Sequence, residues 1–275
     1  MNHPTVTAGL NYLQPSALRP FSYTFAPPPG TPWESGTYEL RPMPIADARA
    51  TPTDIEREGF VLRDAPTAVS DFLDDAEVTA VYHREVAELA LAVTGGTRAH
   101  VFDHLVRQRE ADRTALSFGR RATNGKAAAN GRIHNDYTED SGRRRLAMVL
   151  TDPDEAAAVR RYCIVNIWRS IKGPVLDTPL AVCDARSVMA KDLVNAEVRY
   201  PRRTGEIYLA THSPAHRWSY FSAMDRHEAL VFKQYDSQLG GVSRYTPHAA
   251  FDHPDAPADV PLRESIEARC LVVFE

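Results

Sequence analysis

The chain has few cysteines, no long apolar run and no basic leader segment. Its 275 residues contain three cysteines, Cys163, Cys183 and Cys270, which lie too far apart for a disulfide framework or a zinc-finger spacing. Nowhere do about 18 consecutive apolar residues occur, and no basic segment precedes an apolar stretch at the start. These absences predict a cytoplasmic protein with reduced, buried thiols, without a membrane span or secretory leader.

An excess of positive charge is also lacking. Lys and Arg number 32 against 36 Asp and Glu, so no overall positive field is present to hold a phosphate backbone. With 43% hydrophobic and 25% charged residues, the composition is that of an ordinary globular protein. We therefore expect a small-molecule partner, and neither nucleic acid nor a membrane. The oligomeric state stays open, a homo-oligomer included.

Proline is concentrated between Pro15 and Pro66, and proline cannot donate to a sheet or helix ladder. This segment predicts an irregular arm with short strands at Thr37–Leu40 and Gly59–Leu62. We accordingly divide the chain into an arm, residues 1–66, packed on a single domain, residues 67–275.

The rest of the chain changes from helical to β-type patterns. Apolar residues at three- and four-residue spacing between Ala68 and Val93, followed by Gly95, predict one broken or two short helices. The polar loop 122–131 is a candidate lid. After it come many short β-type runs with regular turn signals, interrupted by helical patterns only at about 154–161 and 185–193. The expected fold is mainly β with flanking helices.

Candidate metal ligands are histidines that are followed two residues later by an aspartate or a glutamate. On a strand, residues two apart share a face and can hold one ion. His83 and Glu85 fall in the helical segment, where two residues are roughly 200° apart around the axis. His253 and Asp255 flank a proline in a loop. The sequence His134-Asn135-Asp136 fits a strand end and is the candidate metal pair, against the alternative of a simple His–Asp hydrogen bond.

A third ligand would complete a set of two histidines and one carboxylate, which suits non-haem iron(II) and its oxygen chemistry. His248 is favoured, because Arg263 and Ser265 follow it and share a strand face. An arginine fork with a hydroxyl can bind a dicarboxylate cosubstrate. His216 remains the rival third ligand, and His212 a more distant one.

Four further residues form a polar and aromatic cluster on and just beyond one predicted strand: Asn166, Trp168, Arg169 and Lys172. We interpret them as candidate substrate-binding residues, with packing in the β core as the alternative. Arg169 and Lys172 favour a carboxylate-bearing substrate. The run Arg143-Arg144-Arg145 is interpreted as a solvated charge cluster rather than an anion site.

Eight short motifs between Thr37 and the C-terminus are unspecific alone but specific together and in this order. They are Glu56-Arg57-Glu58-Gly59-Phe60, Val101-Phe102-Asp103-His104, His134-Asn135-Asp136-Tyr137-Thr138, Asn166-Ile167-Trp168-Arg169, Pro179-Leu180-Ala181, Lys233-Gln234-Tyr235-Asp236-Ser237, Pro247-His248-Ala249-Ala250-Phe251 and Arg263-Glu264-Ser265-Ile266-Glu267-Ala268-Arg269. On these motifs the chain resembles, from about Thr37 to the C-terminus, the hydroxylase/desaturase family of non-haem iron(II), 2-oxoglutarate-dependent oxygenases.

The resemblance implies a double-stranded β-helix, or jelly-roll, core. It also implies His134, Asp136 and His248 as iron ligands, and Arg263 with Ser265 on the distal carboxylate of 2-oxoglutarate. Because the interval from His248 to Arg263 is longer than is usual in the wider superfamily, Arg269 is the reserve.

The implied reaction consumes 2-oxoglutarate and O2, releases succinate and CO2, and hydroxylates or desaturates a small secondary-metabolite or amino-acid-derived substrate through a ferryl intermediate. Two alternatives stay open. One is a cupin-type iron dioxygenase that does not use 2-oxoglutarate, and the other is a non-catalytic jelly roll that binds a small molecule.

Overall fold

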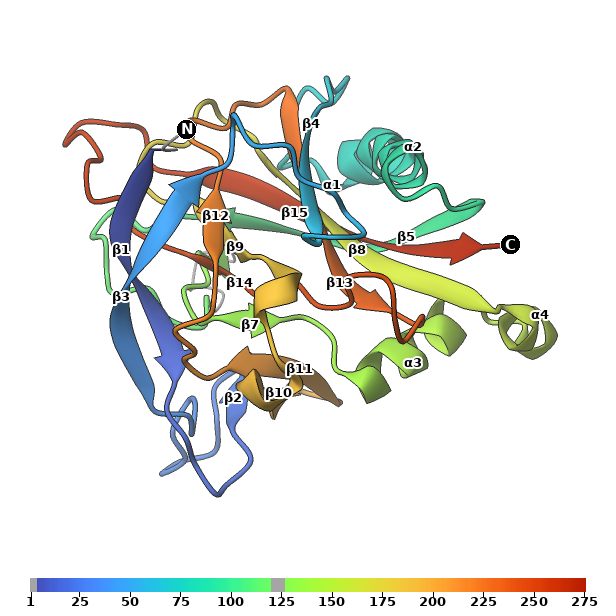
Figure 1. The fold of residues 1–275 in the computed structure, drawn as a ribbon, viewed down its shortest axis with the longest axis horizontal. Coiled ribbons are helices and arrows are strands. Elements are labelled where there is room, and N and C mark those ends of the chain that lie inside the picture. The colour runs from blue at the N-terminus through green and yellow to red at the C-terminus, as the bar shows by residue number, and fades with distance from the viewer. Residues whose placement is uncertain (1–3, 120–126) are drawn as a thin grey trace.

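Two curved β-sheets face each other in this computed structural model, which describes residues 4–119 and 127–275 (Figure 1). The nine-stranded sheet contains, in spatial order, β1 (Thr5–Leu13), β3 (Tyr38–Asp47), β12 (Trp218–Tyr220), β9 (Leu180–Cys183), β14 (His248–Ala250), β7 (His134–Asn135), β11 (Thr204–Ala210), β10 (Leu193–Arg199) and β2 (Phe21–Tyr23). The six-stranded sheet contains β4 (Phe60–Asp64), β13 (Glu228–Asp236), β8 (Arg161–Ser170), β15 (Glu264–Phe274), β5 (Arg98–Gln108) and β6 (Ala127–Ala128). The mainly antiparallel pairing confirms the predicted jelly-roll fold.

The central strands of the six-stranded sheet are buried on both faces. Successive side chains of a strand point to opposite faces. On β8, Val165 and Ile167 therefore pack toward the helices, while Trp168 joins Phe232 and Leu230 between the two sheets. The space between the two sheets is therefore apolar around Trp168. On the same face of β8, the polar residue Asn166 is buried as well.

The helices cover the six-stranded sheet and gather at one side of the molecule, whereas β1 and β3 lie at the other (Figure 1). The helical segments are α1 (Asp75–Glu77), a π-helical segment (Val78–Tyr82), α2 (His83–Thr94), α3 (Glu139–Val149), α4 (Pro153–Ala158) and two 3₁₀ turns (Ala185–Ser187 and Ala190–Asp192). Gly95 ends α2 in the left-handed conformation, with φ of 73°. The predicted broken helix is confirmed, although it begins at Asp75 and its break is the π-helical segment.

The proline-rich segment is more regular than predicted. The expected strands at 37–40 and 59–62 overlap β3 and β4, but β3 extends to Asp47 and pairs with β1 along nearly its whole length. Pro42 and Pro44 fit in β3 because the N–H of Asp47 donates toward β1, so by alternation the proline nitrogens point to the other edge. There β12 pairs with β3 only from Ile45 onward, and no ladder bond is lost.

Other differences concern the helices. Helix α3 is not among the predicted elements, because the three successive arginines at 143–145 conceal its apolar pattern. The expected helix at 185–193 is two short 3₁₀ turns. The helix predicted at about 154–161 corresponds to α4. Of the candidate lid, residues 122–126 lie outside the described residues. Within the part of the chain described, no helix has the length and apolar character needed to cross a bilayer.

Candidate metal centre

The pairing of two short strands brings two distant histidines together. His134 on β7 pairs directly with His248 on β14, and their imidazole centroids are 4.2 Å apart. The Asp136 side chain, just beyond β7, completes the group. Each of the three offers a ligand atom within 4.8 Å of the other two. Two imidazoles and one carboxylate in this arrangement can hold a divalent transition metal on one side.

Both imidazoles are oriented by main-chain carbonyl groups. The Nδ1 atom of His134 lies 2.8 Å from the carbonyl oxygen of Arg132, and that of His248 lies 3.3 Å from the carbonyl oxygen of Thr246. Because a carbonyl oxygen only accepts, each Nδ1 carries a proton and each Nε2 presents a lone pair. Burial, with His134 alongside, lowers the pKa of His248 to about 3. The ring is therefore neutral at physiological pH, which is the form that binds metal.

The carboxylate of Asp136 is held by one of its two oxygens. Its Oδ2 accepts from Arg269 Nε at 2.8 Å and from Asn166 Nδ2 at 2.9 Å. Its Oδ1 is left facing His134, 3.4 Å from Nε2. Burial alone would raise the pKa of Asp136, but the Arg269 guanidinium and the imidazoles hold it well below the usual range. Asp136 is therefore an anion with one oxygen directed into the cluster.

A buried amide network fixes the chain around the cluster. The backbone N–H of Asp136 donates to Gln234 on β13, and Gln234 donates to the carbonyl oxygen of Thr246. The side chain of Asn135 accepts from the N–H of Thr246 and donates to the carbonyl oxygens of Gln234 and Tyr137. These bonds tie β7 to β13 and to the residues before β14, so the positions of both histidines depend on the six-stranded sheet.

Ser265 lies on the inward face of β15, the face that also carries Arg269, and Arg263 directly precedes the strand. Arg263 is buried, and its Nη1 donates to the carbonyl oxygen of Thr178 at 2.9 Å. Its Nε is buried without a hydrogen-bond partner among the described residues. Burial and the nearby guanidinium of Arg107 lower the pKa of Arg263 to about 10. A buried donor without a partner, beside a second positive charge, is what a carboxylate would satisfy. The residues present therefore fit 2-oxoglutarate.

The remaining predicted residues divide into two groups. Asn166 contacts Asp136. The guanidinium carbon of Arg263 lies 5.7 Å from the ring centroid of Trp168. Arg169 lies on the opposite face of β8, where its guanidinium donates to the Tyr82 hydroxyl and to main-chain carbonyls. Lys172 lies beyond the strand with half its side chain exposed and pairs with Glu264. Neither faces the cluster.

The rival third ligand is placed elsewhere. His216 is buried, with Nδ1 3.0 Å from the hydroxyl of Tyr12 and Nε2 3.3 Å from Asp192. The tertiary structure therefore brings His248, and not His216, to His134 and Asp136.

A cavity of about 760 Å³ opens on two of the three candidate metal ligands, and we call it the iron-side cavity. Its lining includes His134 and Asp136, α3, β5 and the β10–β11 hairpin. Sequence analysis did not single out Arg107 or Asn130, which also line it. Strand alternation offered a signal for Arg107, since it shares a face of β5 with Asp103 and pairs with Ser265 across the sheet. Asn130, whose amide nitrogen lies 3.3 Å from Nε2 of His134, carried no such signal.

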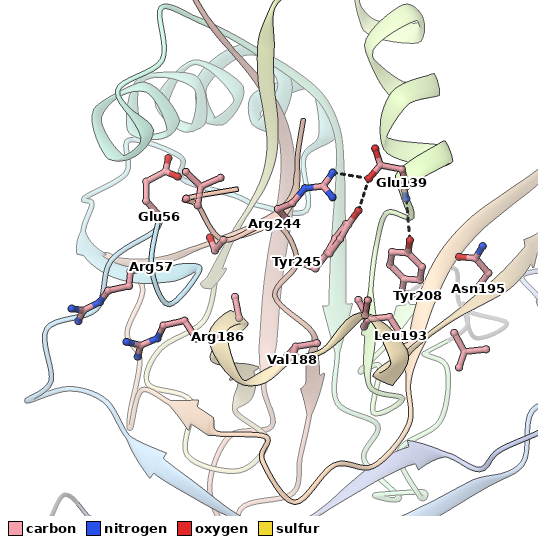
Figure 2. Close-up of a pocket in the computed structure, with 16 residues that line it drawn as sticks. Glu56, Arg57, Glu139, Arg186, Val188, Leu193, Asn195, Tyr208, Arg244 and Tyr245 are labelled. Atoms are coloured by element: carbon pink, nitrogen blue, oxygen red, sulfur yellow. Dashed lines mark hydrogen bonds and ion pairs between the residues drawn. The ribbon is translucent and has the colours of Figure 1, made fainter. Parts of the chain in front are cut away.

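A second cavity, of about 990 Å³, lies on the other side of α3, and we call it the outer cleft (Figure 2). Glu139 is its polar centre, accepting from Arg244 at 2.6 Å and from the Tyr245 hydroxyl at 3.0 Å. At the other end Arg57 and Arg186 both pair with Glu58. The outer cleft is larger than the iron-side cavity, but its charged groups already have partners and it contains none of the metal ligands.

Known proteins resemble the chain over nearly its whole length. A family model described as an oxidoreductase/YMDC permease-like domain (YDMC) matches residues 10–273. The hydroxylase/desaturase efuI of Hormonema carpetanum is 32% identical over 263 residues, covering 86% of this chain and 85% of that protein. The Fe(II)/2-oxoglutarate-dependent dioxygenase nvfI of Aspergillus novofumigatus is 30% identical over 275 residues, covering 95% of this chain and 94% of that protein.

A solved structure agrees with the fold. The iron and alpha-ketoglutarate-dependent endoperoxidase NvfI superimposes with a TM-score of 0.85 at 25% identity, covering 98% of each chain. A variant of the same enzyme gives a TM-score of 0.86 at 26% identity, covering 100% of this chain and 98% of that one. Together with the cluster of two histidines and one carboxylate, these similarities identify the chain as an enzyme that uses iron(II), 2-oxoglutarate and O2. The chain belongs to the family of non-haem iron(II)- and 2-oxoglutarate-dependent oxygenases that includes these hydroxylase/desaturases.

Proposed function

We propose that His134, Asp136 and His248 are the iron ligands of this oxygenase, and that Arg263 with Ser265 binds the distal carboxylate of 2-oxoglutarate. The observation that carries the first assignment is the convergence of three ligand atoms within 4.8 Å, with both Nδ1 protons directed to carbonyl oxygens. The unpartnered Nε of Arg263 supports the second.

Iron(II) with 2-oxoglutarate would supply the oxidant that removes hydrogen from a substrate carbon. The protein's own residues do the rest. Arg269 and Asn166 fix the orientation of Asp136, since both donate to its Oδ2. The apolar cluster around Trp168 and Phe232 keeps water from one side of the centre. We assign Asn166 to ligand positioning and Trp168 to the wall beneath Arg263, and Arg169 and Lys172 no longer belong to the proposed substrate site.

The proposed reaction is hydroxylation or desaturation of a small secondary-metabolite or amino-acid-derived molecule. The names of relatives such as the hydroxylase/desaturase of Hormonema carpetanum support this class. A cytosolic location is proposed as well, because the three cysteines are free and buried, and a reducing compartment keeps such thiols free. Light scattering would measure directly whether the protein forms a homo-oligomer.

An anaerobic titration tests the assignments. Purified protein receives iron(II) and then 2-oxoglutarate, and the charge-transfer absorption of the bidentate chelate is recorded. The native protein should develop the band, and Asp136→Ala and His248→Ala should not. Arg263→Gln should retain iron but require more 2-oxoglutarate, because it removes the charge that binds the distal carboxylate.

His216→Gln is the matched control, because His216 is also buried but lies outside the cluster. This variant should develop the band as the native protein does. Absence of the band in iron-loaded native protein would rule out 2-oxoglutarate as the cosubstrate. Loss of the band in His216→Gln alone would indicate that His216 is the third iron ligand.

A further inference from the structure

Three successive arginines on α3 have different surroundings, although they look alike in the sequence. Consecutive residues of a helix project about 100° apart. Arg143 is 65% exposed and pairs with Glu139 at 2.9 Å, while Arg144 pairs with Glu206 across the mouth of the cavity. Arg144 and Arg145 both line the iron-side cavity. The cluster is therefore not uniformly solvated, and only one of its members reaches inward without an acidic partner.

Arg145 is held by aromatic rings rather than by acids. Its guanidinium carbon lies 4.7 Å from the ring centroid of Phe102 and 5.7 Å from that of Tyr137, which directly follows Asp136. Its Nε is buried without a hydrogen-bond partner, and no ion pair to Arg145 occurs among residues 4–119 and 127–275. Rings orient a guanidinium but do not neutralise it. The positive charge of Arg145 thus remains available beside the metal centre.

The other charges of the iron-side cavity do not compensate for Arg145. The lining contains three carboxylates, Asp103, Asp136 and Glu206, and each of them accepts from either Arg269 or Arg144. Arg107 donates to two main-chain carbonyl oxygens, and Arg203 lies over the Tyr200 ring. Among the described residues, five arginines therefore line the cavity against three carboxylates, and Arg145 contributes to this surplus of positive charge.

Apolar side chains form much of the remaining wall, among them Phe25, Leu105, Phe118, Met148, Val198 and Ile207. We propose that Arg145 binds a carboxylate of the substrate, and that the substrate is a largely apolar small molecule carrying that carboxylate. The inference rests on the proposed function, since it places the substrate in the cavity that opens on the iron ligands. It replaces Arg169 and Lys172 as the origin of a preference for acids.

The test compares carboxylic acids with their neutral amides. Protein loaded anaerobically with iron(II) and saturated with 2-oxoglutarate is titrated calorimetrically with three pairs: cinnamate and cinnamamide, 4-phenylbutyrate and 4-phenylbutyramide, and decanoate and decanamide. Saturation with 2-oxoglutarate keeps the probes away from Arg263. For at least one pair the acid should bind roughly 10- to 100-fold more tightly than the amide, as expected for a charge-assisted pair.

Variants on the same helix assign the preference. Arg145→Gln should abolish the difference between acid and amide, Arg145→Lys should retain part of it, and Arg143→Gln, the matched control on the exposed face, should retain all of it. Circular dichroism checks that each variant is folded. The proposal is wrong if no acid binds more tightly than its amide, or if the preference survives in Arg145→Gln.

Inorganic phosphate supplies a further arm. If it displaces the preferred acid at equal concentration, the site accepts anions generally and the carboxylate class is overturned; failure to displace it supports the proposal. The charge-transfer band is recorded in the same samples. A missing band rejects the cosubstrate assignment, whereas a present band with no acid preference rejects only the role of Arg145.

Discussion

The iron-side cavity and the outer cleft lie on either side of α3 and differ in how their charges are paired. In the outer cleft, Glu139 accepts from Arg244, Tyr245, Tyr235 and Arg143, and the network closes on itself. In the iron-side cavity, Arg145 has no acidic partner among the described residues, and the Nε of Arg263, which is not part of its lining, has no hydrogen-bond partner. A volume of about 990 Å³ against about 760 Å³ would favour the outer cleft. Unsatisfied donors and converging ligands, rather than volume, distinguish the reactive cavity.

The two cavities also share a second wall. On β11, Ile207 lines the iron-side cavity and Tyr208 lines the outer cleft, because neighbouring residues of a strand point to opposite faces. On α3, Arg145 and Glu139 divide in the same way. Paired substitutions a few residues apart can therefore separate the functions of the two cavities.

The largest expected difference comes from the carboxylates. Asp136→Ala should abolish 2-oxoglutarate-dependent succinate formation, because it removes the only acidic member of the ligand cluster. Glu139→Gln, three residues later in the outer cleft, should retain iron and turnover. Succinate is quantified by mass spectrometry after protein-bound iron has been measured. Equal losses in both variants would contradict the division between the cavities.

The arginines should differ next. Arg269→Gln should lower the affinity for iron(II) by roughly 10- to 100-fold, because Asp136 loses a donor that orients it. Arg244→Gln, which removes the corresponding partner of Glu139, should leave that affinity unchanged. Competition with a chromogenic chelator measures both, and an unchanged affinity in Arg269→Gln would show that Asn166 alone suffices to hold Asp136.

The shared wall itself is tested by Gly142 on α3. A Cβ at Gly142 would lie 2.4 Å from the ring of Tyr235, so either α3 or that ring must shift in Gly142→Ala. We expect a loss of about 1–3 kcal/mol in the free energy of unfolding, measured by urea denaturation. Gly173→Ala is the control, since a Cβ there meets no atom within 4 Å. A stability loss of the same size in Gly173→Ala would show that helix packing is not the cause.

The smallest effect is expected in the outer cleft. Tyr245→Phe removes one donor to Glu139 and leaves Arg244 and Arg143 in place. The free energy of unfolding should fall by about 0.5–1.5 kcal/mol. Turnover should stay within twofold of the native rate, roughly. A loss of turnover beyond that range would give the outer cleft a catalytic role.

Much of the fold could be read from local patterns. The strand runs after Arg132 and the helix that ends at Gly95 follow from spacing and from a left-handed glycine. Helix α3 also carried signals, since Thr138 caps it and Glu139 and Asp140 occupy its first turn. These signals do not predict the helix by themselves, because α3 lacks an apolar stripe. For Arg169, strand alternation alone was sufficient to exclude it, because Asn166 and Trp168 define the inward face of β8.

Other features depended on contacts between distant segments. The arginine and serine that follow His248 favour it over His216, but only the pairing of β14 with β7 and β9 brings it to His134. Nothing local marks Arg145 among its neighbours, and only the rotation of α3 over Phe102 turns it inward. The role of Arg269 likewise follows from β15 lying beside β8, which brings its guanidinium to Asp136.

The sequence by itself determined the chemical groups available and their local geometry: a histidine and an aspartate two residues apart at a strand end, and an arginine and a serine on one strand face. The tertiary structure decided which second histidine joins them and which arginines lack acidic partners. The physical reason is range. Alternation and helical spacing act within a few residues, whereas ligand convergence and charge pairing depend on sheets that join segments more than a hundred residues apart.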